Sequence, residues 1–159
     1  MNKILILGVG NVLLSDEGVG VHALYALEKE DWPANVDLLD GGTGGIHLTG
    51  DLQEYDILVM LDATLDNEPP GTIRLLQPRR ALDFPPLISA HEIGLQDMIT
   101  VMALTDKLPD IYLFTVSVKN INEVKIRLSP EIAACLPSLK KQVRHLVNRL
   151  NTEPAACSL

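Results

Sequence analysis

The sequence is poor in cysteine, in basic side chains and in long apolar runs. It contains two cysteines, Cys135 and Cys157, in 159 residues. Because they are so few and lie so late in the chain, they do not predict a disulfide scaffold, and we expect a protein of the reducing cytoplasm. The formal net charge of −8 argues against a nucleic-acid partner, because phosphate binding requires basic patches.

The sequence also lacks the signals of a membrane or secreted protein. No stretch approaches the ~20 consecutive apolar residues of a membrane span, so we expect no membrane insertion. The segment Met1–Gly8 predicts a short strand that ends in glycine, without the cleavage site of a secretory signal. The length predicts a single domain over residues 1–159, with a frayed tail after about Asn151.

Apolar runs alternate with helical patterns along the chain, which is typical of an α/β protein. The most apolar runs predict strands that are covered on both faces. Strands are predicted at residues 3–7, 36–40, 57–61, 72–76 and 111–118. Helices are predicted at residues 17–30, 43–55 and 93–104 and from Ser129 onward, with Pro137 breaking or kinking the last region and Ser138 starting a final helix.

Three carboxylates and one imidazole lie near the ends of the predicted strands, where the functional residues of α/β proteins are usually found. Asp16 is expected to cap the first helix, and Glu17 follows it in the first turn. Asp62 comes directly after the predicted strand at residues 57–61, and His91 follows a proline-rich link. Because the carboxyl ends of parallel strands meet at one crevice, we expect these side chains to converge there.

Such a group of side chains allows two kinds of chemistry. Two carboxylates and one imidazole can hold a divalent metal ion and leave coordination positions open for a substrate. Without a metal, two close carboxylates raise the pKa of one of them, which gives a general acid and a general base. Taken singly, Glu17 also fits a residue that merely stabilises a helix dipole.

Two better-known motifs do not fit. The sequence Gly8-Val-Gly10 suggests a dinucleotide-binding turn, but the third glycine of that motif would fall at Leu13. The acids at the following helix start would also repel a phosphate. The pair His91-Glu92 begins like a zinc-protease motif, but Leu95 stands where that motif needs its second histidine.

Four motifs occur in one order along the chain. They are Gly8-Val-Gly10-Asn11-x-Leu13-x-x-Asp16-Glu17-Gly18-x-Gly20, Asp40-Gly-Gly-Thr-x-Gly45, Asp62-Ala63 and Ser89-x-His91-x-x-Gly94-Leu95-x-Asp97. Together they resemble the hydrogenase maturation endopeptidases, which process the large subunit of nickel–iron hydrogenases. The resemblance covers residues 3 to about 150. It implies a three-layer α/β sandwich, with a twisted, mainly parallel sheet of about five strands and helices on both faces.

The resemblance also implies a site and an activity. Glu17, Asp62 and His91 would coordinate nickel that the precursor brings, so no permanent cofactor is expected. The enzyme, an aspartic-type or metal-dependent endopeptidase, would remove a C-terminal extension from the large-subunit precursor and act as a monomer. In this hypothesis Asp16 or Asp62 activates the attacking water.

The cleft for the substrate would be lined by the glycine-rich segment that follows the second strand. Its members are Asp40, Gly41, Gly42, Thr43 and Gly45. Missing side chains there would let the backbone of a peptide come close. The alternative from another functional class is a nickel-binding assembly chaperone that docks on the same precursor without cutting it, because the same ligands would serve both.

Overall fold

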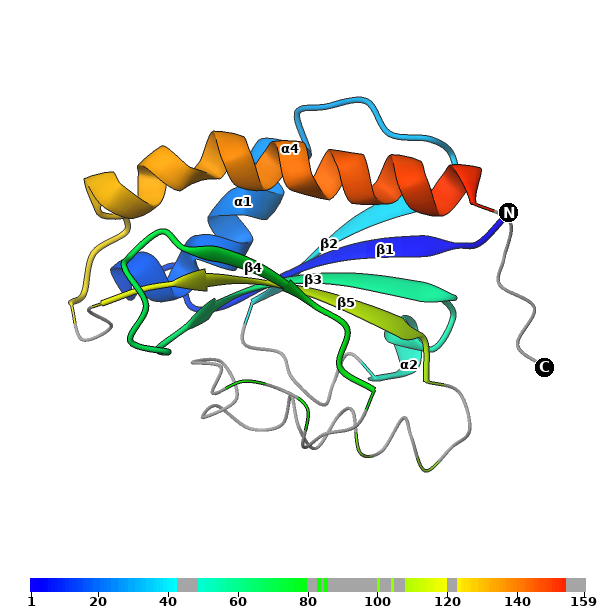
Figure 1. Ribbon diagram of the computed structural model, residues 1–159, viewed down its shortest axis with the longest axis horizontal. Coiled ribbons are helices and arrows are strands. Elements are labelled where there is room, and N and C mark those ends of the chain that lie inside the picture. The colour runs from blue at the N-terminus through cyan, green and yellow to red at the C-terminus, as the bar shows by residue number, and fades with distance from the viewer. Residues whose placement is uncertain are drawn as a thin grey trace.

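A five-stranded sheet forms the centre of the computed structural model, which describes residues 1–42, 49–79, 83, 85, 100, 104, 108–119 and 123–153 (Figure 1). The strands are β1 (Ile4–Val9), β2 (Val36–Gly42), β3 (Ile57–Thr64), β4 (Ile73–Leu76) and β5 (Asp110–Ser117). Their order across the sheet is β2-β1-β3-β5-β4. The first four in that order run parallel, whereas β4 pairs antiparallel with β5 at the edge.

Helices cover both faces of this sheet, which confirms the three-layer α/β fold (Figure 1). The helices α1 (Val19–Leu27) and α4 (Pro130–Thr152) lie on one face, and the short helix α2 (Thr49–Leu52) lies on the other. Every residue of β1 and β3 is buried. Two continuous apolar runs therefore form the strands at the centre, as expected for a sheet between two layers of helix.

The larger core cluster lies between the sheet and the pair α1 and α4. From α4 it takes Ile132, Leu139, Val143, Leu146 and Val147. The smaller cluster lies on the α2 side of the sheet. It is built from alternate residues of β1, β3 and β5 together with Leu52 of α2. Side chains of successive strand residues point to opposite faces, so β1 and β3 supply both clusters.

Several boundaries differ from the sequence prediction, and three of these differences lie near the predicted site. The strand β2 continues past Asp40 through Gly42, and β3 continues to Thr64, so that Asp62 lies inside a strand and pairs with Thr115 of β5. Before α1, residues Ser15–Gly18 form a 3₁₀ turn, η1, and Gly18 is the N-cap residue. The prediction that Asp16 caps this helix is therefore wrong.

The prediction of a break at Pro137 is also wrong, because α4 is one helix of 23 residues that continues through it. A proline inside a helix removes one hydrogen bond and costs about 3 kcal/mol. The apolar stripe of α4 is buried on both sides of Pro137, and this burial outweighs the local cost. Ser129 is the N-cap residue and Pro130 the first helical residue, as predicted.

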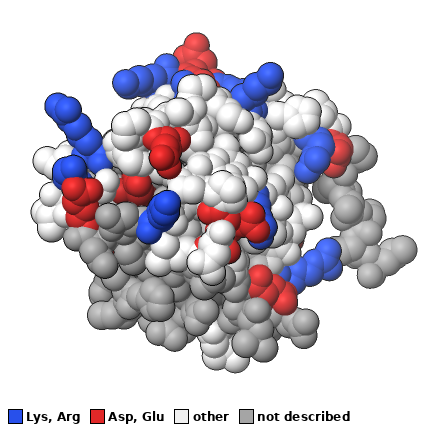
Figure 2. Space-filling model, turned by 60° about the vertical axis from the view of Figure 1, so that its left-hand side comes forward, with Lys and Arg blue, Asp and Glu red and all other residues white. Residues whose placement is uncertain are grey.

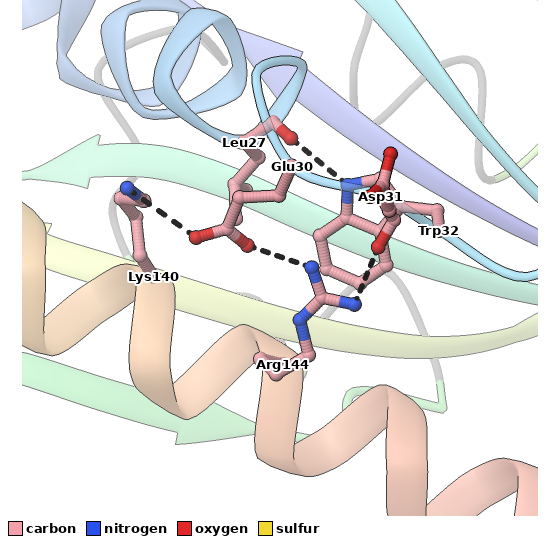
Figure 3. A network of polar contacts seen from close by, with 6 residues as sticks. All are labelled: Leu27, Glu30, Asp31, Trp32, Lys140 and Arg144. Carbon is pink, nitrogen blue, oxygen red and sulfur yellow. Dashed lines mark hydrogen bonds and ion pairs between the residues drawn. The ribbon is translucent and has the colours of Figure 1, made fainter.

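A polar network fixes α4 against the end of α1 (Figure 3). The carboxylate of Glu30 accepts a hydrogen bond from Arg144 Nη2 at 2.8 Å and forms an ion pair with Lys140 Nζ at 3.3 Å. The Arg144 guanidinium also lies over the Trp32 ring, 3.7 Å from its centroid. This network lies on the surface, since the side chains of Glu30 and Arg144 are each 31% exposed.

Parts of the predicted helices at residues 43–55 and 93–104 fall outside the described residues. Within the first, Thr49–Leu52 is helical, and within the second Thr100 and Leu104 are helical. Among the described helices none combines the length and apolar character needed to cross a membrane.

Candidate active site at the carboxyl ends of the strands

Glycines let α1 approach the sheet unusually closely at the carboxyl ends of β1 and β3. A Cβ atom on Gly20 would lie 2.1 Å from the carbonyl oxygen of Leu61 and 2.6 Å from that of Val9. A Cβ atom on Gly10, whose φ is +136°, would lie 2.3 Å from the carbonyl oxygen of Glu17. Real side chains do not fit at these distances. A Cβ atom on Gly8 would lie 2.6 Å from the carbonyl oxygen of Gly20. Gly8 and Gly10, which suggested a nucleotide-binding turn, are therefore needed for packing.

This packing brings the elements that carry Glu17 and Asp62 together. The turn η1, which contains Glu17, contacts β3, which contains Asp62. Leu61, whose carbonyl lies against Gly20, is the residue directly before Asp62. The two predicted metal ligands thus come from adjoining backbone segments at one end of the sheet.

Both side chains are buried. Glu17 is 5% exposed and Asp62 is 1% exposed. One oxygen of Asp62, Oδ1, accepts a hydrogen bond from the backbone N–H of Ala63 at 2.7 Å. Removing a carboxylate from water costs several kcal/mol, which hydrogen bonds or a positive ion must offset. Two buried acids on contacting segments are therefore candidates for a site that binds a cation or transfers protons.

The third acid of this region, Asp16, has a different partner. It is 6% exposed, and its Oδ1 accepts a hydrogen bond from the backbone N–H of Ser129 at 2.7 Å. Ser129 precedes α4 by one residue, so the Asp16 carboxylate lies at the positive end of that helix dipole. The neighbouring Ser15 has a φ of 50° and is buried as well.

The predicted substrate segment begins at the end of β2. Asp40 accepts hydrogen bonds from the Tyr25 hydroxyl at 2.7 Å and from the backbone N–H of Gly42 at 2.9 Å. The bond from Tyr25 to Asp40 raises the pKa of the tyrosine hydroxyl. Asp40 and Gly42 line a pocket of about 200 Å³ with Val21 and the segment from Gly10 to Leu13. Gly41 is buried beside them.

The chain is similar to known proteins over most of its length. A family model described as hydrogenase maturation protease matches residues 21–145. The chain is 37% identical over 145 residues to the hydrogenase 2 maturation protease of Escherichia coli, a match that covers 89% of this chain and 88% of the relative. The chain belongs to the hydrogenase maturation protease family. It is therefore a peptidase, which places it among the hydrolases.

Solved structures of this family have the same fold. The hydrogenase maturating endopeptidase HybD of Escherichia coli superposes with a TM-score of 0.84 at 35% identity, over 92% of this chain and 93% of that chain. The nickel–iron hydrogenase maturation protease HybD of Thermococcus kodakarensis superposes with a TM-score of 0.74 at 26% identity, over 91% and 98% of the two chains. The fold of the protease is therefore that of HybD.

Several predicted site residues of the protease lie outside the described residues. These are His91, Thr43 and Gly45. In the part of the chain that the structure describes, no three His, Cys, Asp or Glu side chains gather closely enough to hold a metal ion. The ligand trio of Glu17, Asp62 and His91 therefore stays a prediction, of which the structure brings two members to the same end of the sheet.

The sequence did not reveal the contacts that connect this end of the protease to α4. The Ser15 hydroxyl donates a hydrogen bond to the carbonyl of Arg127 at 2.9 Å, and Ser129 supplies the N–H for Asp16. Both pairs are more than 110 residues apart in the chain. No local pattern predicts such contacts. The positive φ of Ser15 has no signal in the sequence either, since glycine is the residue that usually adopts it.

Proposed function

We propose that this protease removes the C-terminal extension of a nickel-loaded large-subunit precursor of a nickel–iron hydrogenase. The observation that supports it best is the burial of Glu17 and Asp62 on adjoining segments at the carboxyl end of the sheet. Oxygen ligands together with one imidazole suit a borderline divalent ion such as nickel. The relatives are named for hydrogenase maturation, which supplies the substrate class.

In this proposal the nickel ion belongs to the substrate. Glu17, Asp62 and His91 engage the ion in the docked precursor and so place the scissile peptide over the carboxyl ends of β1 and β3. Asp40 and Gly42 line a pocket with the segment from Gly10 to Leu13, where the extended tail can approach the backbone. A carboxylate then takes a proton from the attacking water, a role that requires it to lie within hydrogen-bond reach of that water.

The proposal is tested by incubating the protein with nickel-loaded precursor and measuring the mass of the large subunit. Loss of the extension is expected with the nickel-loaded form, and no loss with the same precursor prepared without nickel. Precursor that binds but stays intact would favour the non-proteolytic chaperone. Equal cleavage of both forms would refute nickel as the recognition mark while leaving the peptidase activity in place.

A further inference from the structure

An apolar groove opens beside the segment that carries Asp16 and Glu17. It is lined by Leu13 and the run 124–127, and its volume is about 580 Å³. The side chains of Leu13, Val124 and Ile126 are 57%, 80% and 70% exposed. Apolar side chains that gather around one concavity mark an interaction site, whereas single exposed ones need no explanation.

The two walls of the groove are fixed to each other by backbone contacts. Leu14 and Lys125 form a parallel bridge, and the N–H of Ser15 donates to the carbonyl of Lys125 at 2.7 Å. The hydroxyl of Ser15 adds its bond to Arg127. A ligand of this groove therefore finds its walls already in place, which reduces the entropic cost of binding.

The rim of the groove is basic in a protein that is acidic as a whole. Lys125 and Arg127 line it, while the chain carries a formal charge of −8. Lys125 forms an exposed ion pair with Glu123 at 2.6 Å, and Arg127 makes no ion pair with any described residue. Figure 2, in which the left-hand end of Figure 1 comes forward, shows acidic and basic side chains interspersed over this side of the molecule. The local charge at the groove favours a partner with acidic residues next to an apolar one.

The groove also lies within reach of the proposed site. Leu13 precedes Glu17 by four residues, and four residues of fully extended chain span at most about 14 Å. A polypeptide that places its scissile bond at Glu17 and Asp62 therefore has the groove within a few residues of that bond.

We propose that this groove docks the large-subunit precursor, and that it takes an apolar side chain with an acidic neighbour close to the scissile bond. This inference rests on the proposed function. It adds a specificity surface outside the predicted metal ligands and outside the glycine-rich segment.

The test compares groove variants with single changes of the same kind elsewhere on the surface. The groove variants are Val124→Ser with Ile126→Ser, and Lys125→Glu with Arg127→Glu. The controls are Leu75→Ser, at an apolar side chain that is 41% exposed, and Lys141→Glu. Cleavage of nickel-loaded precursor is measured over a range of precursor concentrations. We expect the KM of each groove variant to rise about 10-fold or more and kcat to stay within about twofold, because only binding is lost.

The outcome separates this inference from the proposed function. If the wild-type protein does not cleave the precursor, the proposed function fails. If it cleaves and the groove variants keep the KM of the controls, the groove does not dock the precursor. A fall in kcat at unchanged KM would also overturn the inference. The binding of each variant is measured a second time, without turnover, in a background that also carries Asp62→Asn, and the same loss of affinity is expected there.

A separate observation supports a second inference, on the role of Asp16. Its carboxylate accepts the N–H of Ser129 across 113 residues of sequence, with Ser15 bonded to Arg127 beside it. Glu17 is the next residue in the same 3₁₀ turn. A displacement of this turn moves Glu17 relative to Asp62, and a misplacement of about 1 Å costs on the order of 100-fold in rate.

We infer that Asp16 is a positioning residue, which holds Glu17 in place through the N–H of Ser129 instead of acting on the water itself. This inference also rests on the proposed function. Its strongest test is the exchange of the carboxylate for an amide. Asn at position 16 keeps the accepting oxygen and loses the charge, so Asp16→Asn is expected to cleave the precursor within about threefold of the wild-type rate. Asp16→Ala is expected to lose on the order of 100-fold in kcat.

The partner of Asp16 offers an independent variant. Ser129 has a φ of −61°, which proline also adopts, so Ser129→Pro keeps that angle while it replaces the N–H by a ring carbon that faces the Asp16 carboxylate. We expect Ser129→Pro to lower kcat as Asp16→Ala does, and the double variant to be no worse than either single one. All rates are measured well below the melting temperature of each variant. If Asp16→Ala does not fold, Asp16→Asn and Ser129→Pro test the inference without it. Loss of activity in Asp16→Asn would show that the charge itself is required and would overturn the inference.

Discussion

Two groups of acidic side chains in this protein have opposite surroundings. Glu30, between α1 and α4, lies on the surface between Lys140 and Arg144 (Figure 3). Glu17 and Asp62, at the carboxyl end of the sheet, are almost fully buried. The hydrogen bond from Arg144 and the ion pair with Lys140 hold the pKa of Glu30 below its usual range. The surface acid therefore stabilises the fold.

Glu17 and Asp62 differ from Glu30 because they are buried. Taking a carboxylate out of water costs several kcal/mol, so buried acids at the end of a sheet are candidates for a chemical role. The same residue type thus serves stability in one region and, in our proposal, chemistry in the other. Variants of each acid should therefore show opposite patterns of activity and stability.

The largest effect is expected for Asp62→Asn. The amide keeps an oxygen for the N–H of Ala63 but loses the negative charge, so cleavage of nickel-loaded precursor should fall by about 10³-fold or more. Because a buried charge is removed, we expect the melting temperature to stay the same or to rise. Mass spectrometry and thermal unfolding measure the two effects. If this variant cleaves the precursor at the wild-type rate, Asp62 has no role in catalysis.

The packing beneath the acids is tested at Gly20. Its added Cβ atom would lie 2.1 Å from the carbonyl oxygen of Leu61, so Gly20→Ala must displace α1 from β3. We expect a loss of about 3 kcal/mol or more in the free energy of unfolding. Gly50→Ala is the matched control, since nothing lies within 4 Å of its Cβ position, and it should not destabilise the protein. Equal stability of the two variants would contradict the close approach of helix and sheet.

A smaller effect is expected for Arg144→Ala. The change removes the hydrogen bond to Glu30, the bond to the carbonyl of Asp31 and the stacking on Trp32. We expect a loss of about 1–2 kcal/mol in the free energy of unfolding, measured by urea denaturation. The cleavage rate should not change, because this network lies away from η1 and Asp62. If Arg144→Ala loses cleavage and keeps its stability, the network serves activity and does not stabilise the fold.

The smallest effect concerns pH. The pKa of Glu30 is lowered from 4.5 in the folded protein, so its pairing stabilises the fold fully above that value. The contribution is lost as the pH falls through the folded pKa. The difference in stability between the wild type and Glu30→Gln should therefore be largest near neutral pH and shrink below about pH 4.5. If the difference in stability between the two proteins grows toward acid pH, the pKa of Glu30 is not lowered in the folded protein.

The strands were the most predictable part of the fold. The runs at Ile4–Leu7 and Ile57–Leu61 are continuous and apolar, and both form buried strands at the centre of the sheet. The boundaries near the site were less predictable. Pairing with β5 extends β3 past Asp62, and pairing with β1 extends β2 through Gly42. Strand ends are set by the neighbouring strand, which a local pattern does not contain.

Pro137 shows the same limit for helices. Local propensity predicts a break there, yet α4 continues because five apolar residues distributed along its length are buried in one core cluster. For the site, residue type and position selected Glu17 and Asp62, which the structure places on contacting segments. They were not enough to find the partner of Asp16, which lies 113 residues away.

The sequence by itself determined the α/β class, the central strands and the acids at their carboxyl ends, because the period of apolar residues and the place of acids after strands are local properties. Tertiary structure alone decided that the glycines serve close packing and that Asp16 binds the start of α4. It also decided that Leu13 and Val124 share one groove. These outcomes depend on contacts between distant segments, and such contacts form only when the burial of a common core brings those segments together.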